Sequence, residues 1–166
     1  MQGHGAHIIL TREDAKRVFG AAGDVAVQEI ANELRGSKRH CEAKLVLETG
    51  ANWDAIHRCL TDGTLEPTAG EFPLNQVILG GKQLFKGAGF EAVMVRPDLT
   101  AFIAEALHNL KREEIHDKYM QLPAAELGYT PTEQESDIVW NAIQQIRQLF
   151  EDAAAERCAV MFTVER

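Results

Sequence analysis

The pattern that most constrains the fold is a long amphipathic helix followed closely by a short apolar strand near the C-terminus. Thr132 and Glu135 have the spacing of a capping box, which marks the start of the helix. Beyond them, apolar residues recur at helical spacing on one stripe: Val139, Ala142, Ile143, Ile146, Leu149, Phe150 and Ala153. Residues 159–164, "AVMFTV", then predict a strand. Such a stripe must be covered by a sheet or by other helices.

Three further apolar runs predict strands earlier in the chain. They are "HIIL" at residues 7–10, "AKLVLE" at 43–48 and "FEAVMV" at 90–95. Strands and helices do not alternate regularly, which favours the α+β class over a parallel α/β fold. We therefore expect residues 1–166 to form a single compact domain, with a small, mostly antiparallel or mixed sheet of three to four strands packed by several helices.

Capping residues place helices between these strands. Thr11 and Asp24 begin two helices, and Asp98 begins a third whose inner face is predicted to carry Leu99, Phe102, Ile103, Ala106, Leu107 and Leu110. The segment "FPLNQVILGG" at 72–81 has a proline where the first helical turn tolerates one, and it predicts a short buried helix. The glycines of "KGAGF" at 86–90 mark a turn.

The segment "NWDAIHRCLTDG" gathers several chemically reactive residue types within one predicted helix. At 100° per residue, its apolar stripe consists of Trp53, Ile56 and Leu60, and the edge of that stripe carries Asp54, His57 and Thr61. A functional interpretation is that Asp54 orients the His57 ring, so that the other ring nitrogen serves as a general base or ligand contact. Trp53, Asp54, His57 and Thr61 are therefore the candidate ligand-binding residues.

A structural interpretation of the same helix remains open. Asp54 can pair with Arg58 four residues later, and a carboxylate or backbone carbonyl can satisfy a partly buried His57. Trp53 is then a core residue, because large aromatic side chains on helix stripes most often pack inside. No catalytic residue can be assigned from the helix alone.

The charge of the chain bears on its partners. Twenty-five acidic residues oppose 17 basic ones, giving a net charge of -8, which disfavours nucleic acid and favours a protein partner with a basic surface. No apolar run approaches the length of a membrane span, and the N-terminal residues do not resemble a signal peptide. Three widely spaced cysteines fit a reducing compartment, so we expect a cytoplasmic protein without membrane partners.

Motifs for metals, cofactors and nucleophiles are incomplete in this sequence. There is no HExxH and no CxxC pair, and "LGGKQ" lacks the first glycine and the hydroxyl residue of a phosphate loop. No serine or cysteine completes a recognisable triad motif. The sequence therefore predicts no metal site and no cofactor.

Three longer stretches together resemble the YfbM-like family, a bacterial family of unknown function also catalogued as DUF1877. They are "WDAIHRCLTDG" at 53–63, "FPLNQVILGGKQL" at 72–84 and "FEDAAAERCAVMFTV" at 150–164. The resemblance implies a compact α+β domain. It brings no substrate, cofactor or catalytic residue, and residues 50–52 depart from the Asp and Lys pair expected before the tryptophan.

Two functional hypotheses of different kinds follow, and the oligomeric state is left open. The first is a soluble, non-enzymatic binding module for a protein partner, of immunity or regulatory type. The alternative is a small enzyme or small-ligand binder that uses the Asp54, His57 and Thr61 ridge beside Trp53. A third reading assigns any exposed apolar helix face to self-association.

Overall fold

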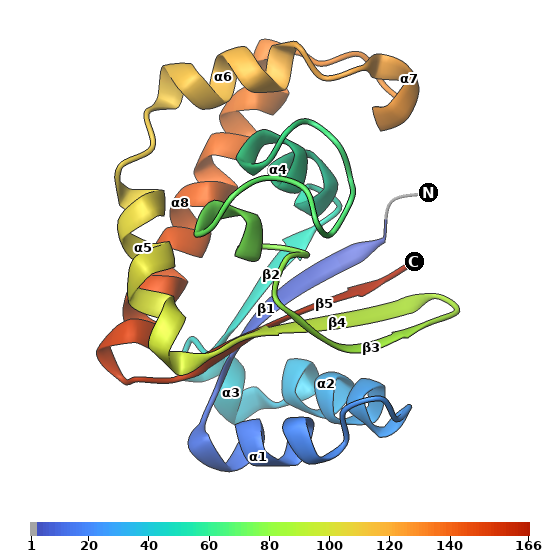
Figure 1. Ribbon diagram of the computed structural model, residues 1–166, viewed down its shortest axis with the longest axis vertical. Coiled ribbons are helices and arrows are strands. Elements are labelled where there is room, and N and C mark those ends of the chain that lie inside the picture. The colour runs from blue at the N-terminus through green and yellow to red at the C-terminus, as the bar shows by residue number, and fades with distance from the viewer. Residues whose placement is uncertain (1–2) are drawn as a thin grey trace.

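The computed structural model describes residues 3–166 as a central sheet with helices on both faces (Figure 1). Within these residues the sheet has five strands in the order β2-β1-β5-β4-β3, and all neighbouring strands are antiparallel. The strands are β1 His4–Leu10, β2 Val46–Gly50, β3 Lys82–Gly87, β4 Phe90–Val95 and β5 Ala159–Glu165. The strands nearest the two chain ends, β1 and β5, therefore pair with each other in the middle of the sheet.

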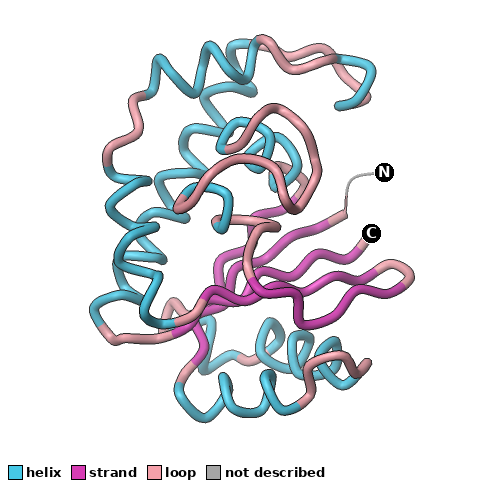
Figure 2. The backbone as a smooth tube through the Cα atoms, in the orientation of Figure 1, coloured by secondary structure: helices cyan, strands magenta, loops and turns pink. Residues whose placement is uncertain are grey.

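Two layers of helices enclose the sheet, as Figure 2 shows with the strands in magenta between the cyan helices. One layer contains α1 Arg12–Gly20, α2 Ala26–Gly36 and α3 Lys38–Glu42. The other contains α4 Trp53–Leu60, α5 Thr100–His108, α6 Arg112–Met120, α7 Ala124–Leu127 and α8 Glu133–Ala155, with two 3-10 turns, η1 Leu74–Gln76 and η2 Pro97–Leu99. The predicted α+β class is confirmed.

Each face of the sheet has its own hydrophobic core. Ile8 and Met161 belong to the core shared with α1 and α2, whereas Ile9, Phe162 and Val164 belong to the larger core shared with α4, α5, α6 and α8. Successive strand residues point to opposite faces, so a strand covered on both sides needs apolar residues at nearly every position. This explains why β1, β4 and β5 are visible in the sequence as continuous apolar runs.

The structure adds one strand to the three or four that the sequence predicts. This strand, β3, lies at the edge of the sheet, and Leu84 is its only buried residue. A bulge interrupts its pairing with β4 between Gln83 and Phe85. An exposed edge strand carries little apolar alternation, so sequence patterning showed only the turn that follows it.

The buried helix predicted for residues 72–81 is wrong. Only the single 3-10 turn η1 forms, and Val77, Ile78 and Leu79 follow it as a buried turn. The backbone N–H of Gly80 donates to the Asn75 carbonyl 3.0 Å away, and a Cβ atom on residue 80 would lie 2.2 Å from that oxygen. The predicted burial holds for Val77, Ile78 and Leu79 but not for the whole segment, because Phe72 is exposed.

The predicted helix caps Thr11 and Thr132 are confirmed. The hydroxyls of Thr11 and Thr132 accept hydrogen bonds from the backbone N–H groups of Asp14 and Glu135, each at 3.2 Å. Asp98, by contrast, lies within η2 and pairs with Arg96 instead of capping α5. The N-cap of α5 is Leu99, one residue later than predicted.

Candidate functional site

Helix α4 carries the residues that the sequence singles out, and all eight of its residues are buried. It contacts α6, α8 and η1, so no side of the helix faces solvent freely. The Trp53 ring lies 6.1 Å from the Phe162 ring, and its indole N–H donates to the Gly3 carbonyl at 3.0 Å. Trp53 thus has its single donor satisfied within the core.

Asp54 is engaged by Arg58, one turn along the same helix. The Arg58 Nε donates to Asp54 Oδ1 at 2.6 Å, and both residues are only 6% exposed. Arg58 also donates to the Gly63 carbonyl at 3.2 Å and to the carboxylate of Glu126. Burial works against the guanidinium charge, but the hydrogen bonds that Arg58 donates to Asp54 and Glu126, with the attraction of the two carboxylates, outweigh it and raise the pKa of Arg58. The ion pair fixes α4 to the loop that follows it and to α7.

His57 is 1% exposed, and its Nε2 lies 3.0 Å from the Glu66 carbonyl oxygen. Because a carbonyl only accepts, Nε2 must carry the proton and donate it. Burial lowers the pKa of His57, and the Glu66 hydrogen bond opposes that shift only in part. The ring is therefore held neutral, and it fastens residue 66 of the long loop to α4.

Thr61 is the one member of the predicted ridge that borders open space. It is half-buried and lines two cavities, of about 410 and 440 Å³. Its hydroxyl donates to the His57 carbonyl at 2.7 Å, so it closes the end of α4. Asp54, His57 and Thr61 are thus neighbours along the helix whose side chains bind three different partners: Arg58, the loop carbonyl and the helix backbone.

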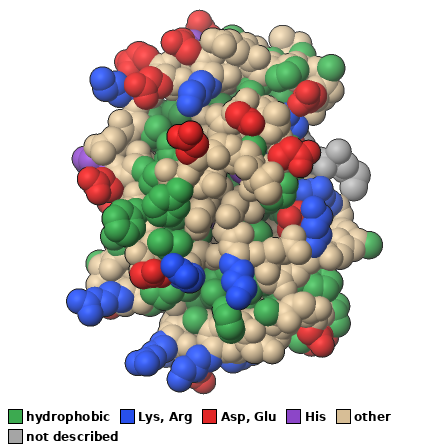
Figure 3. Space-filling view, in the orientation of Figure 1, with side chains coloured by type: hydrophobic (Ala, Val, Ile, Leu, Met, Phe, Trp, Pro, Cys, Tyr) green, Lys and Arg blue, Asp and Glu red, His purple; other side chains and the backbone are tan. Residues whose placement is uncertain are grey.

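Phe72 lines the cavity of about 440 Å³ and contacts Phe102, a second exposed aromatic residue, and the sequence marked neither as functional. Phe72 is 48% exposed and Phe102 is 55% exposed, and their rings meet edge to face with centroids 6.2 Å apart. The prediction that Phe102 lies on the inner face of α5 is wrong, because it points outward while Ile103 and Leu107 are buried. Figure 3 shows hydrophobic side chains gathered over α5 and the neighbouring loop.

Charge at this cavity is of one sign. Its apolar lining includes Phe72 and Leu74, and the charged residues that line it are Asp62 and Glu71. Glu105, exposed on α5, follows Phe102 by three residues and so lies on the same side of that helix. We call the surface formed by Phe72, Phe102 and this cavity the aromatic groove. It joins an apolar centre to an acidic rim.

Across residues 3–166, no group of three or more His, Cys, Asp or Glu side chains is arranged to hold a metal ion. In the same residues, none of the helices combines the length and apolar character needed to cross a membrane.

The protein is an α+β domain whose five-stranded antiparallel sheet lies between two helical layers. The buried helix α4, which begins at Trp53, lies beside the aromatic groove. The chain belongs to the family described as a domain of unknown function, DUF1877, whose model matches residues 1–163. A crystal structure of a protein of unknown function, YfbM from Escherichia coli, has the same fold, with a TM-score of 0.69. At 16% sequence identity, the match covers 97% of this chain and 99% of that one. No curated protein matches the chain.

The family assignment made from three sequence stretches is therefore confirmed. An identity of 16% supports the shared fold alone.

Proposed function

We propose that this protein is a binding module that recognises a basic segment of another protein through the aromatic groove. The observation that carries the proposal is the pair of half-exposed rings, Phe72 and Phe102, beside a cavity whose charged residues are acidic. Aromatic side chains left in solvent at a concave surface are typical anchors of protein interfaces. The occupant that fits is an apolar side chain flanked by Lys or Arg.

Electrostatics support the same choice of partner. Asp62 and Glu71 lie at the groove, and the net charge of -8 attracts a basic chain from a distance. Rim charges contribute more to association rate and selectivity than to affinity. We therefore expect the rings to determine how tightly the segment binds and the carboxylates to determine which segments are selected.

The test is selection from a displayed peptide library, followed by fluorescence anisotropy with the selected peptides. We expect sequences that combine an aromatic or aliphatic residue with neighbouring Lys or Arg. Phe72→Ser and Phe102→Ser should each weaken binding at least about tenfold, as expected for interface anchors. Phe19→Ser is the matched control, because Phe19 is 51% exposed but lies on α1, in the other helical layer.

Two results would contradict the proposal. One is a selected peptide set without basic residues, or one whose binding does not change in the Phe72 and Phe102 variants. The other is a dimer, detected by light scattering, that Phe72→Ser converts to a monomer, because the groove would then be occupied by a second copy of the chain.

A small-ligand function using Asp54, His57 and Thr61 is the second candidate. Its support is that Thr61 lines, besides the cavity of the aromatic groove, a second cavity of about 410 Å³. A ligand held there should lose affinity in Thr61→Val and keep it in Phe102→Ser. The opposite pattern would place the ligand in the aromatic groove.

A further inference from the structure

A cavity of about 790 Å³ lies at one end of the sheet, away from the aromatic groove. Four connections meet around it: residues 10–12 lead from β1 into α1, residues 43–45 from α3 into β2, and residues 156–158 from α8 into β5, while Pro97 follows β4. We call it the sheet-end cavity. Its volume is within the range of small-molecule binding sites, roughly 300–1,000 Å³.

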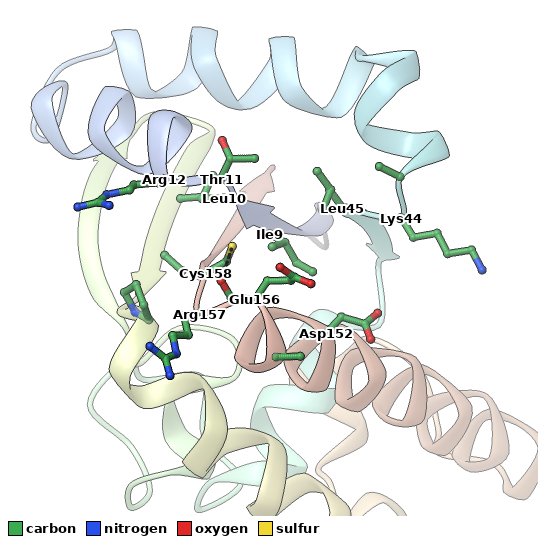
Figure 4. Close-up of a pocket in the computed structure, with 14 residues that line it drawn as sticks. Ile9, Leu10, Thr11, Arg12, Lys44, Leu45, Asp152, Glu156, Arg157 and Cys158 are labelled. Atoms are coloured by element: carbon green, nitrogen blue, oxygen red, sulfur yellow. Dashed lines mark hydrogen bonds between the residues drawn. The ribbon is translucent and has the colours of Figure 1, made fainter.

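The interior of the sheet-end cavity is apolar and draws on both hydrophobic cores. Ile9 belongs to the core shared with α8, whereas Leu10 and Ala159 belong to the core shared with α1 and α2. Leu45 and Cys158 are only half-buried, so apolar surface stays open to solvent there. Figure 4 shows Ile9, Leu45 and Cys158 in the middle of the cavity. A ligand that fits this interior must present an apolar body.

A second cavity, of about 510 Å³, adjoins the sheet-end cavity on the α1 and α3 side. Thr11, Arg12, Ala43 and Leu45 line both cavities, so the two are continuous. Arg39 lines the smaller one. An elongated ligand can therefore keep its apolar part in the sheet-end cavity and place a polar end where the two cavities join.

Unpaired cations concentrate around these two cavities. Nine of the 17 Lys and Arg residues form ion pairs within residues 3–166, which leaves eight without one. Four of those eight, Arg12, Arg39, Lys44 and Arg157, line the two cavities. A shortage of acidic partners does not explain this, because the chain has 25 Asp and Glu residues. The cations are therefore available to an anionic ligand.

The acidic residues that line the cavities leave one side free for such an anion. Glu13 and Asp14 line the smaller cavity, and Asp14 is already paired with Arg17. Asp152 and Glu156 line the larger one, and both lie at the C-terminal end of α8. The facing wall comes from the start of α1 and the turn before β2, and its charged residues at the sheet-end cavity are both cations (Figure 4).

We propose that the sheet-end cavity binds a straight-chain alkyl carboxylate. The alkyl chain lies over Ile9, Leu45 and Cys158, and the carboxylate lies between Arg12 and Arg39, where the two cavities join. Arginine binds a carboxylate through two parallel hydrogen bonds, which makes it the favoured residue for this head group. A singly charged head group fits better than a phosphate, because acidic residues line the same cavities.

The test is titration calorimetry of the full chain at neutral pH with three probes of equal length: octanoate, 1-octanol and octylammonium. We expect octanoate to bind most tightly, at least about tenfold more tightly than octylammonium, because only its head group forms charge-assisted hydrogen bonds with arginine. Hexanoate should bind about tenfold more weakly than octanoate, since two fewer methylene groups are buried.

Substitutions of the two arginines test the position of the head group. Arg12→Gln and Arg39→Gln should each weaken octanoate binding by about threefold to tenfold and leave 1-octanol binding unchanged. Neither arginine has a side-chain hydrogen bond or ion pair in the described residues, so both variants should fold normally. Lys111→Gln is the matched control, because it removes an unpaired cation that lines neither cavity. Glu156→Gln should strengthen octanoate binding, because it removes an acidic charge from the cavity.

Filling the cavity tests the position of the alkyl chain. Ala155 is exposed on α8 and lines the sheet-end cavity, so Ala155→Trp should weaken octanoate and 1-octanol alike. Ala101→Trp, at an exposed site on α5 outside this cavity, should leave both unchanged. In methyl NMR spectra, octanoate should shift the signals of Ile9 and Leu45 and leave Leu74, which lines the aromatic groove, unaffected.

Three results would overturn the proposal. Absence of octanoate binding at millimolar concentration would remove the site. Octylammonium binding as tight as octanoate binding, or unchanged octanoate affinity in both arginine variants, would rule out the carboxylate head group. Octanoate binding that persists in Ala155→Trp would place the ligand elsewhere. Phe102→Ser should leave octanoate binding unchanged, so the outcome here is independent of the function proposed for the aromatic groove.

Discussion

His7 Nε2 donates a hydrogen bond to the carbonyl of Val77, 2.8 Å away, and thereby joins strand β1 to a segment seventy residues later. The other ring nitrogen, Nδ1, lies 2.8 Å from the Thr49 hydroxyl and accepts its hydrogen. The ring is fully buried against Phe150 and Phe162. His7 is thus a neutral histidine whose two nitrogens hold β1, β2 and the buried turn together.

This environment makes the stability of the fold depend on pH. Burial lowers the pKa of His7 to about 4, despite the opposing hydrogen bond to Val77, whereas an unfolded chain has a value near 6.5. Below pH 6.5 the unfolded state binds more protons than the folded state. The free energy of unfolding therefore decreases by roughly 3 kcal/mol as the pH is lowered from 6.5 to about 4. Urea denaturation at pH 7 and pH 4.5 measures this. In His7→Gln the fall over that interval should be smaller than in the wild type; an equal fall would assign it to other groups.

The ion pair in α4 predicts two very different costs for removing a carboxylate. Asp54→Asn leaves the buried Arg58 charge with only an exposed acidic partner, and should cost about 3 kcal/mol of stability. Glu126→Gln removes that exposed partner and should cost less than about 1 kcal/mol. Chemical denaturation of both variants at neutral pH makes the comparison. Similar costs would mean that Asp54 and Glu126 contribute equally to holding Arg58.

Neighbouring residues of α5 should respond oppositely to truncation. Ile103→Ala removes a fully buried side chain and should cost about 2–4 kcal/mol. Phe102→Ser changes an outward-facing ring and should alter stability by less than about 1 kcal/mol. Thermal unfolding followed by circular dichroism separates the two. A large loss in the Phe102 variant would show that its ring supports the fold more than it serves as a binding surface.

Two glycines offer a matched test of local backbone packing. Gly80→Ala places a methyl group against the Asn75 carbonyl, with a Cβ–oxygen separation of 2.2 Å, and should destabilise the fold by more than about 1 kcal/mol. Gly36→Ala adds a methyl group at the end of α2 where nothing lies within 4 Å, and should raise stability by about 0.5 kcal/mol. Urea midpoints measure both. A tolerated alanine at position 80 would mean that the buried turn can relax.

Local spacing was enough to predict some contacts and not others. The pairing of Asp54 with Arg58 follows from two residues four positions apart on one helix, and the structure confirms it. The aromatic groove could not be predicted in this way, because Phe72 and Phe102 are thirty residues apart and meet only once the sheet has placed α5 beside the loop. The inner face predicted for Phe102 was wrong because apolar residues lie on more than one side of α5, so spacing alone did not distinguish its buried face.

The same limit applies to the contacts of His40 with Ser37 and Asp14. Ser37 and His40 are three residues apart, which the sequence shows, but Asp14 comes from another helix, twenty-six residues before His40. The edge strand β3 was not predicted either, because its exposed face and its bulge leave little alternation of apolar residues in the sequence. The periodicity of apolar residues predicts helices, strands and much of the core. It does not predict which residues from distant segments come into contact.

The central position of β5 has a consequence for synthesis on the ribosome. His4 is paired with Glu165, and β5 separates β1 from β4 in the sheet. Until residues 159–165 emerge, β1 and β4 have no partner along those edges, and both hydrophobic cores lack their middle strand. Non-local pairing of this kind slows folding, because a long loop must close before its contacts form. The sheet can therefore be completed only after residues 159–165 have been synthesised.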